Sequence, residues 1–149
     1  MTQEEKQLLL KDLSARLRYE TWVKYEGKEW LVTGYGHGRV SLLPSVFSSV
    51  GGPCPLVEEV RPYLRSMSSM TEEELKELNE KYGNIAYFFM QEPPYYHGLQ
   101  AQHSDIGSIE ISEFSEIYDW LNSHHFDYRG LIEKGLAIEV TKENNPYKD

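Results

Sequence analysis

The spacing of the hydrophobic residues changes from helical to strand-like within the first 43 residues, and this change constrains the fold most. A capping box at Thr2–Glu5, followed by a stripe of leucines, predicts a helix over about Gln3–Arg16. Two segments rich in β-branched and aromatic residues, Thr21–Tyr25 and Glu29–Thr33, come next and are separated by a short Glu-Gly turn, which predicts a hairpin. A helix followed by a β-meander places the chain in the α+β class.

More strands are expected after this hairpin. Arg39–Leu43 follows the glycine-rich turn Gly34–Gly38 and should form a third strand. Ile85–Met90 has the composition of a strand buried on both faces, and Leu136–Val140 of a final strand. We expect a small antiparallel sheet, curled and able to close into a barrel, with three to four helices packed on it.

The remaining helices are predicted from their start and stop signals. Thr71 and Glu74 form a second capping box, which predicts a helix that ends near Gly83. Ser112 can cap a third helix, and a short fourth helix is expected over Asp127–Lys134. The expected order of elements is therefore α-β-β-β-α-β-α-α-β.

The length of 149 residues fits a single α+β domain, 1–149. The segment Pro44–Pro55 is rich in proline, glycine and serine, which is typical of a loop. It suggests a sub-module 1–55, with a helix and the meander, and a second sub-module 56–140 with the other helices and strands. The polar stretch 141–149 is expected to be a flexible tail.

The net charge of −9 is unevenly distributed along the chain. Through Arg65 there are nine Lys and Arg against eight Asp and Glu, a balance of +1; from Ser66 onward six oppose sixteen, a balance of −10. Because such a surface repels phosphate backbones, we expect no direct nucleic-acid binding. The acidity serves solubility, or it forms a face that docks on a basic partner.

The sequence also bears on the cellular compartment. The longest apolar run, Ile85–Met90, has six residues, whereas a membrane span needs about 20. The N-terminus shows no basic segment that leads into an apolar one, and Cys54 is the only cysteine. We expect a cytoplasmic protein that does not contact membranes.

No residue pattern indicates catalysis or a cofactor. The one cluster that could bind a metal or move protons consists of four histidines, which lack zinc-site spacing: His97, His103, His124 and His125. Cys54 lies between two prolines, without the cationic neighbour that activates a thiol. Gly34–Gly38 lacks the Lys-Ser/Thr of a phosphate-binding loop. We therefore predict no catalytic, cofactor-binding or metal-binding residues.

Aromatic residues suggest an interface more than a catalytic site. Tyrosine and tryptophan are favoured anchors in protein interfaces, although they serve equally well in a core. Five aromatic residues gather around the long loop and the third predicted helix: Tyr95, Tyr96, Trp120, Phe126 and Tyr128. We predict that they form an interface with an unidentified protein partner or with a second copy of the chain.

Three stretches resemble a recurrent group of short proteins that Bacteroidetes genomes encode within prophages or other mobile elements. They are Leu8–Leu17 (LLLKDLSARL), Pro62–Glu74 (PYLRSMSSMTEEE) and His124–Ala137 (HHFDYRGLIEKGLA). The regions from about Trp22 to Pro55 and from Ile85 to Gly107 depart most from the group. The resemblance implies a bacterial, cytoplasmic, accessory role, and it assigns no functional residues.

The leading hypothesis is a non-enzymatic protein–protein interaction module of a prophage or mobile element, acting through an aromatic-rich face. The first alternative is an acidic inhibitor that mimics the charge of DNA and blocks a nucleic-acid enzyme. The second is a small hydrolase or binding protein that uses His97, His103 or His124.

Overall fold

The computed structural model describes residues 1–45, 51–82 and 111–147. The chain forms two compact units, which are named here by their main elements. The sheet unit comprises Met1–Leu64 and Leu131–Asp149, and the helical unit comprises Arg65–Gly130. These boundaries differ from the expected sub-modules 1–55 and 56–140, because residues 56–64 and the C-terminal segment belong with the N-terminal strands.

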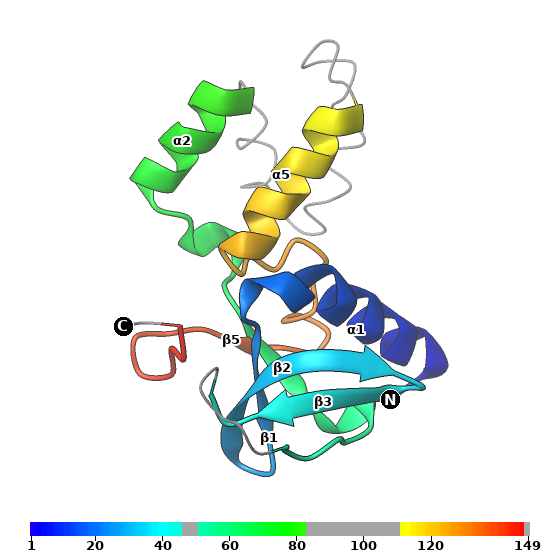
Figure 1. Cartoon of the computed structure of the whole chain (residues 1–149). Coiled ribbons are helices and arrows are strands. Elements are labelled where there is room, and N and C mark those ends of the chain that lie inside the picture. Colours follow the sequence, from blue (N-terminus) through cyan, green and yellow to red (C-terminus); the bar gives the residue numbers. More distant parts are fainter. Residues whose placement is uncertain (46–50, 83–110, 148–149) are drawn as a thin grey trace. The chain divides into compact units, whose positions relative to one another are not determined.

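The sheet unit contains a five-stranded sheet with the order β3-β2-β1-β4-β5 (Figure 1). The strands are β1 Trp22–Tyr25, β2 Lys28–Gly36, β3 Arg39–Leu43, β4 Arg61–Leu64 and β5 Ile138–Glu139. All neighbouring pairs are antiparallel except β4 and β5, which run parallel. The α+β class is therefore confirmed, whereas the sheet is mixed and not purely antiparallel.

The sheet is open, so the expectation of a barrel was wrong. Closure would require the edge strand β3 to pair with β5, but another segment of the chain already occupies the outer edge of β3. The amide of Val40 donates to the carbonyl of Pro55 at 2.9 Å, and the amide of Leu42 donates to that of Pro53 at 3.1 Å. Because proline has no N–H, this segment also offers few donors to any further strand.

Both predicted hairpins are confirmed, and their turns have the same geometry. Glu26 and Gly27 connect β1 to β2 with φ values of 50° and 77°, and His37 and Gly38 connect β2 to β3 with 52° and 73°. Two successive residues with positive φ form the type I′ turn, whose twist matches that of the adjoining strands.

Helix α1, Gln3–Arg16, has the bounds that its sequence predicts. Thr2 Oγ1 accepts from the amide of Glu5 at 3.1 Å, and the Glu5 carboxylate accepts from the amide of Thr2 at 2.9 Å, which completes the capping box. Leu9 and Leu13 are buried and pack with Val23, Val32, Val40 and Leu42 of the sheet. This aliphatic layer between α1 and the sheet is the main core of the sheet unit.

The segment after the Pro53–Leu56 stretch forms a short helical turn and then a strand. Val57–Glu59 forms one 3-10 turn, and Arg61–Leu64 then forms β4. Pro62 lies inside this strand, opposite Val23 of β1. A proline is unusual inside a sheet because it cannot donate to the ladder.

The C-terminal part departs from its prediction. The fourth helix expected over Asp127–Lys134 is absent from this described segment, where Gly130 adopts a φ of 76° and the chain forms turns. Such a φ value is incompatible with an α-helix. The final strand is confirmed, but it has only two residues, Ile138–Glu139. The expected flexible tail is folded as far as Tyr147, whose hydroxyl binds the sheet.

The helical unit contains α2, Glu72–Tyr82, and α5, Ile111–Ser123. Together with α1 they are the three α-helices of the described ranges, within the predicted three to four. The capping box of α2 is present, with Glu74 N–H donating to Thr71 Oγ1 at 3.2 Å and Thr71 N–H to the Glu74 carboxylate at 2.9 Å. The strand expected at Ile85–Met90 lies outside the described residues.

Candidate interaction surface

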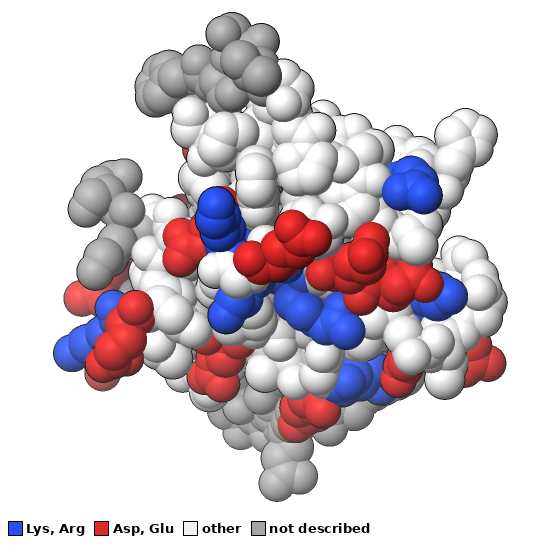
Figure 2. Space-filling view, turned by 90° about the horizontal axis from the view of Figure 1, so that it is seen from below, with Lys and Arg blue, Asp and Glu red and all other residues white. Residues whose placement is uncertain are grey.

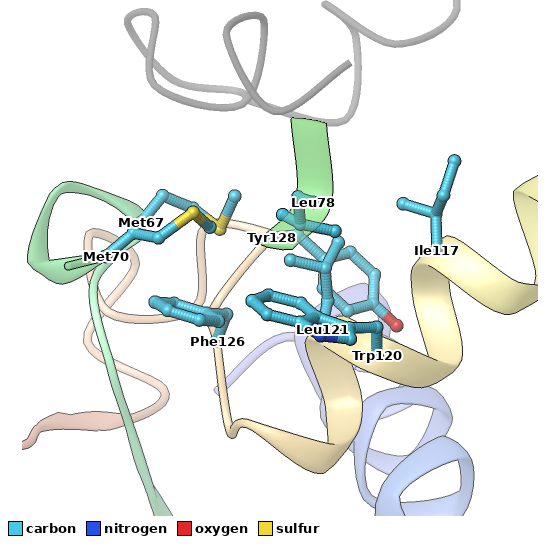
Figure 3. Close-up of a cluster of buried hydrophobic side chains, with 8 residues drawn as sticks. All are labelled: Met67, Met70, Leu78, Ile117, Trp120, Leu121, Phe126 and Tyr128. Atoms are coloured by element: carbon cyan, nitrogen blue, oxygen red, sulfur yellow. The ribbon is translucent and has the colours of Figure 1, made fainter. Parts of the chain in front are cut away.

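Three of the five aromatic residues predicted to form an interface lie in the core of the helical unit. Phe126 is fully buried, and Tyr128 and Trp120 keep only 3% and 8% of their surface exposed. They pack with Met67, Met70, Leu78, Ile117 and Leu121 (Figure 3). Trp120, Phe126 and Tyr128 are therefore core residues and do not form an exposed aromatic face. Tyr95 and Tyr96 lie outside the described residues, so their part of the interface stays a prediction.

Trp120 connects α5 to α2. Its indole Nε1–H donates to Glu77 Oε1 on α2 at 3.2 Å, so the one polar atom of the ring is satisfied at the edge of the core. Its ring stacks on that of His124 at a centroid distance of 3.9 Å, and on Phe126 at 5.9 Å. Trp120 lies off the apolar stripe that the sequence of α5 shows, and the structure adds it to the buried face of that helix.

Arg65 organises the start of the helical unit. Its guanidinium makes two hydrogen bonds of 2.7 Å to the Glu74 carboxylate and lies 4.1 Å from the centroid of Phe126. Its backbone pairs with a distant segment, because Arg65 N–H donates to His125 C=O and Asp127 N–H donates to Arg65 C=O, both at 2.8 Å. A planar guanidinium suits both a two-pronged carboxylate contact and an aromatic face.

The Arg65–Glu74 pair changes the acidity of the carboxyl group. Burial would raise the pKa of Glu74, but the hydrogen bonds from Arg65 and from the amide of Thr71 outweigh burial and lower this pKa to about 2. The side chains of Arg65 and Glu74 are 22% and 17% exposed, so solvent screens the pair only partly. Glu74 is therefore a structural carboxylate and not a docking residue.

Tyr128 also belongs to the core of the helical unit and is hydrogen-bonded to α5. Its hydroxyl donates to Oδ1 of buried Asn122 at 2.9 Å, and its ring lies 5.0 Å from that of Tyr118. Burial raises the pKa of the Tyr118 phenol above its ordinary value. These contacts use the hydroxyl of Tyr128 inside the unit, where it holds the turn after α5 against the helix.

Charge, in contrast, is concentrated on the helical unit. Its residues include four Lys and Arg against twelve Asp and Glu, a net charge of −8, whereas eleven against twelve in the sheet unit give −1. On α2 the exposed acids are Glu72, Glu73, Glu77 and Glu80. Glu73, Glu77 and Glu80 follow helical spacing on the face opposite Leu75 and Leu78, so α2 turns its apolar side inward and its acidic side outward.

Of the described histidines and the cysteine, His37 and Cys54 belong to the sheet unit, and His124 and His125 belong to the helical unit. His37 occupies the exposed turn between β2 and β3, while the ring Nδ1 of His124 lies 2.9 Å from the carbonyl of Trp120 in the helical unit. Exposed Cys54 lies 3.8 Å from the Ser41 hydroxyl. His97 and His103 are outside the described residues. Within the described ranges, no group of three or more His, Cys, Asp or Glu could hold a metal ion.

Two structural residues of these units escaped the sequence analysis. Arg65 and Tyr147 each join segments that are far apart in the chain, and periodicity detects only local relations. For Arg65, the available sign in the sequence was its opposite charge to Glu74 of the nearby capping box. The lone tyrosine in a polar tail was the sign for the second.

Comparison with protein-family models, with curated proteins and with solved structures finds no match. The likeness to short proteins of mobile elements therefore stays a prediction. Among the described residues, none of the helices combines the length and the apolar character needed to cross a membrane.

Proposed function

We propose that the chain is a non-enzymatic protein–protein interaction module, and that its acidic helical unit docks on a basic surface of a protein partner. The observation that carries this proposal is the separation of charge, with −8 on the helical unit and −1 on the sheet unit. Electrostatic complementarity between opposed patches speeds association and selects partners. An accessory role in a prophage or mobile element is part of the same proposal, and it rests on the sequence resemblance alone.

The arrangement of α2 supports docking by its outer face. Leu75 and Leu78 pack into the core, and the acids on the other side of the helix are exposed. Glu74 is held by Arg65, and Glu77 accepts from Trp120, which leaves Glu72, Glu73 and Glu80 as the better candidates for contact. Lys76 lies 3.8 Å from Glu80, but both side chains are largely exposed and such pairs contribute little.

A pair of charge variants tests this proposal. The docking variant carries Glu72→Gln, Glu73→Gln and Glu80→Gln on α2. The matched control carries Glu4→Gln, Glu29→Gln and Glu133→Gln, three exposed acids of the sheet unit that include one in a first helical turn. Both remove three negative charges, so an effect of net charge alone would be equal in the two chains.

Affinity capture from bacterial extract with the wild-type chain and both variants, followed by mass spectrometry, supplies the readout. We expect a partner that the wild-type chain and the sheet control retain, that the α2 variant loses, and that moderate salt releases. Equal retention by the two variants would show that the acids of α2 do not dock. Circular dichroism of each variant verifies that α2 remains folded.

The DNA-mimic hypothesis is a narrower form of the same docking, and it requires a continuous row of acids. Figure 2 shows one face of the molecule, on which basic and acidic side chains are interspersed. If the captured partner binds DNA and a short DNA duplex displaces the chain from it, mimicry replaces the general proposal.

The hydrolase hypothesis relies on His97, His103 or His124, and the first two of these lie outside the described residues. His124 contacts the carbonyl of Trp120 and stacks on its ring. The same carbonyl also accepts from the His124 amide at 3.1 Å and from the Ser123 hydroxyl at 2.8 Å, so the His124 ring is part of the hydrogen-bonded end of α5. We therefore place the hydrolase below both binding hypotheses.

A further inference from the structure

The C-terminal segment is joined to the sheet by the hydroxyl of one tyrosine. The phenolic oxygen of Tyr147 accepts from the backbone N–H of Trp22 at 3.1 Å and donates to the backbone C=O of Tyr63 at 2.8 Å. Trp22 belongs to β1 and Tyr63 to β4. A side chain from the end of the chain thus takes part in the hydrogen bonding between two strands.

This hydroxyl lies where the ladder between β1 and β4 would otherwise continue. The two strands pair at Val23–Pro62 and at Lys24–Arg61. The next positions along them are Trp22 and Tyr63, and there the phenolic oxygen stands between the two backbone groups. We call the gap between Trp22 N–H and Tyr63 C=O the phenol slot.

The phenol slot requires a particular kind of side chain. It needs one atom that both accepts and donates a hydrogen bond, which a hydroxyl does and a carboxylate or ammonium does not. Serine and threonine hydroxyls sit close to their own backbone, whereas tyrosine carries its hydroxyl at the end of a long rigid ring. Burial raises the pKa of the Tyr147 phenol far above its ordinary value, which agrees with a slot that keeps the hydroxyl protonated and away from water.

The tail is folded into the shape that presents this ring. Asn144 Oδ1 accepts from the amide of Thr141 at 2.6 Å and from its hydroxyl at 2.7 Å. Asn145 Oδ1 accepts from the amide of Tyr147 at 2.9 Å. Such asparagine turns are local, so a separate copy of the segment can form them as well.

We propose that the phenol slot is a binding site for a tyrosine-bearing peptide, filled within the chain by Tyr147 and able to receive the C-terminal segment of a second copy. Residues 140–147 belong to no helix or strand, so their exchange removes no strand from the sheet. Two copies that exchange tails form a symmetric pair, because each supplies a tail and a slot. Exchange is favoured at high protein concentration, since the tethered tail competes at an effective concentration in the millimolar range.

The test uses the full-length chain with Tyr147→Ala and a synthetic peptide of residues 141–149. The readout is hydrogen exchange at the Trp22 amide, together with the melting temperature. We expect Tyr147→Ala to speed exchange at Trp22 at least tenfold, and millimolar peptide to restore both protection and melting temperature. A peptide with phenylalanine at the tyrosine position serves as the control and should restore neither.

Equal rescue by the two peptides, or rescue by neither, would overturn the proposal. If the Tyr147→Ala chain does not fold, the tyrosine peptide should refold it, and failure to do so has the same meaning. Tyr147→Phe, which keeps the ring, tests the hydroxyl alone: we expect a folded chain with fast exchange at Trp22. The site lies in the sheet unit, so these results are independent of docking by α2.

Discussion

The sheet unit and the helical unit are stabilised in different ways, although one chain builds both. In the sheet unit, backbone ladders join four of the five strands in antiparallel pairs, and the core under α1 is aliphatic. In the helical unit, the core contains aromatic and methionine side chains. Arg65, the residue after β4, binds Glu74 of α2 and the backbone of the turn after α5. Each unit also contains an ion pair: Arg16 and Asp12 lie 2.9 Å apart and fully buried in the sheet unit, and Arg65 and Glu74 lie 2.7 Å apart and partly exposed in the helical unit.

The difference extends to the surface. The sheet unit is nearly neutral, and its outer β3 edge is covered by a segment with two prolines, which limits pairing with other chains. Among its described residues, the helical unit buries Trp120, Phe126 and Tyr128 and exposes the acids Glu72, Glu73, Glu77 and Glu80 of α2. We infer that the sheet unit is the scaffold and that the helical unit is the part that meets a partner.

The largest expected effect is on the helical core. Phe126→Ala removes a fully buried ring that stacks with Trp120 and lies under Arg65, and the loss should be about 4 kcal/mol of unfolding free energy. Hydrogen exchange should show the loss in α2 and α5, with less change in β1 and β2. Equal loss of protection in both units would contradict the division, because it would show one cooperative structure.

In the sheet unit, the substitution with the largest expected effect is at Gly52. A Cβ at Gly52 would lie 2.0 Å from the carbonyl oxygen of Leu42 in β3. Gly52→Ala must therefore push the Pro53–Leu56 segment away from β3, and we expect a loss of about 3 kcal/mol. Chemical denaturation measures this loss. Gly51→Ala is the control, since a Cβ there meets nothing within 4 Å; similar losses in the two variants would refute the close approach.

Acid should weaken the helical unit through Glu74. The pKa of Glu74 is lowered to about 2 in the folded chain, below its value of 4.5 in the unfolded chain. The unfolded chain therefore binds more protons between these values, and the stability that the carboxylate provides is present above pH 4.5 and lost as the pH falls toward 2. We expect a loss of about 2 kcal/mol, measured by urea denaturation at several pH values. Glu74→Gln should abolish this part of the pH dependence, and a pH profile unchanged by Glu74→Gln would contradict the assignment.

The smallest effect is expected at a hairpin turn. His37 adopts a φ of 52°, a conformation that asparagine tolerates better than histidine. His37→Asn should stabilise the sheet unit by about 0.5 kcal/mol, visible as a small rise in melting temperature. A lower melting temperature for His37→Asn would argue against the type I′ geometry.

Sequence patterns between residues three or four apart predicted much of this structure, whereas contacts between distant segments left no pattern that could be recognised. The capping boxes at Thr2 and Thr71 and the leucine stripe of α1 are relations between residues three or four apart, and the structure confirms them. The fourth helix failed because Gly130 favours a turn with positive φ. The open sheet could not be predicted, because it depends on the pairing of Pro53 and Pro55 with β3 across a loop.

The aromatic interface shows the same limit. Tyrosine and tryptophan are suited to cores and to interfaces alike, so composition could not tell where Trp120, Phe126 and Tyr128 lie. Their burial depends on contacts with Met67 and Met70, which precede α2 and lie some 50 residues earlier in the chain. The excess of acid in the second part was visible from the sequence, and the structure narrows it to the segment Arg65–Gly130.

The most direct test of the central claim is the salt dependence of binding between the chain and its captured partner. Affinity is measured from low to physiological salt for the wild-type chain, the α2 variant and the sheet control. If the acids of α2 dock on a basic surface, the wild-type chain and the sheet control should lose affinity steeply with salt, while the α2 variant should bind weakly with a shallow slope. Three parallel slopes would contradict the account, because docking would then owe nothing to the charge of the helical unit.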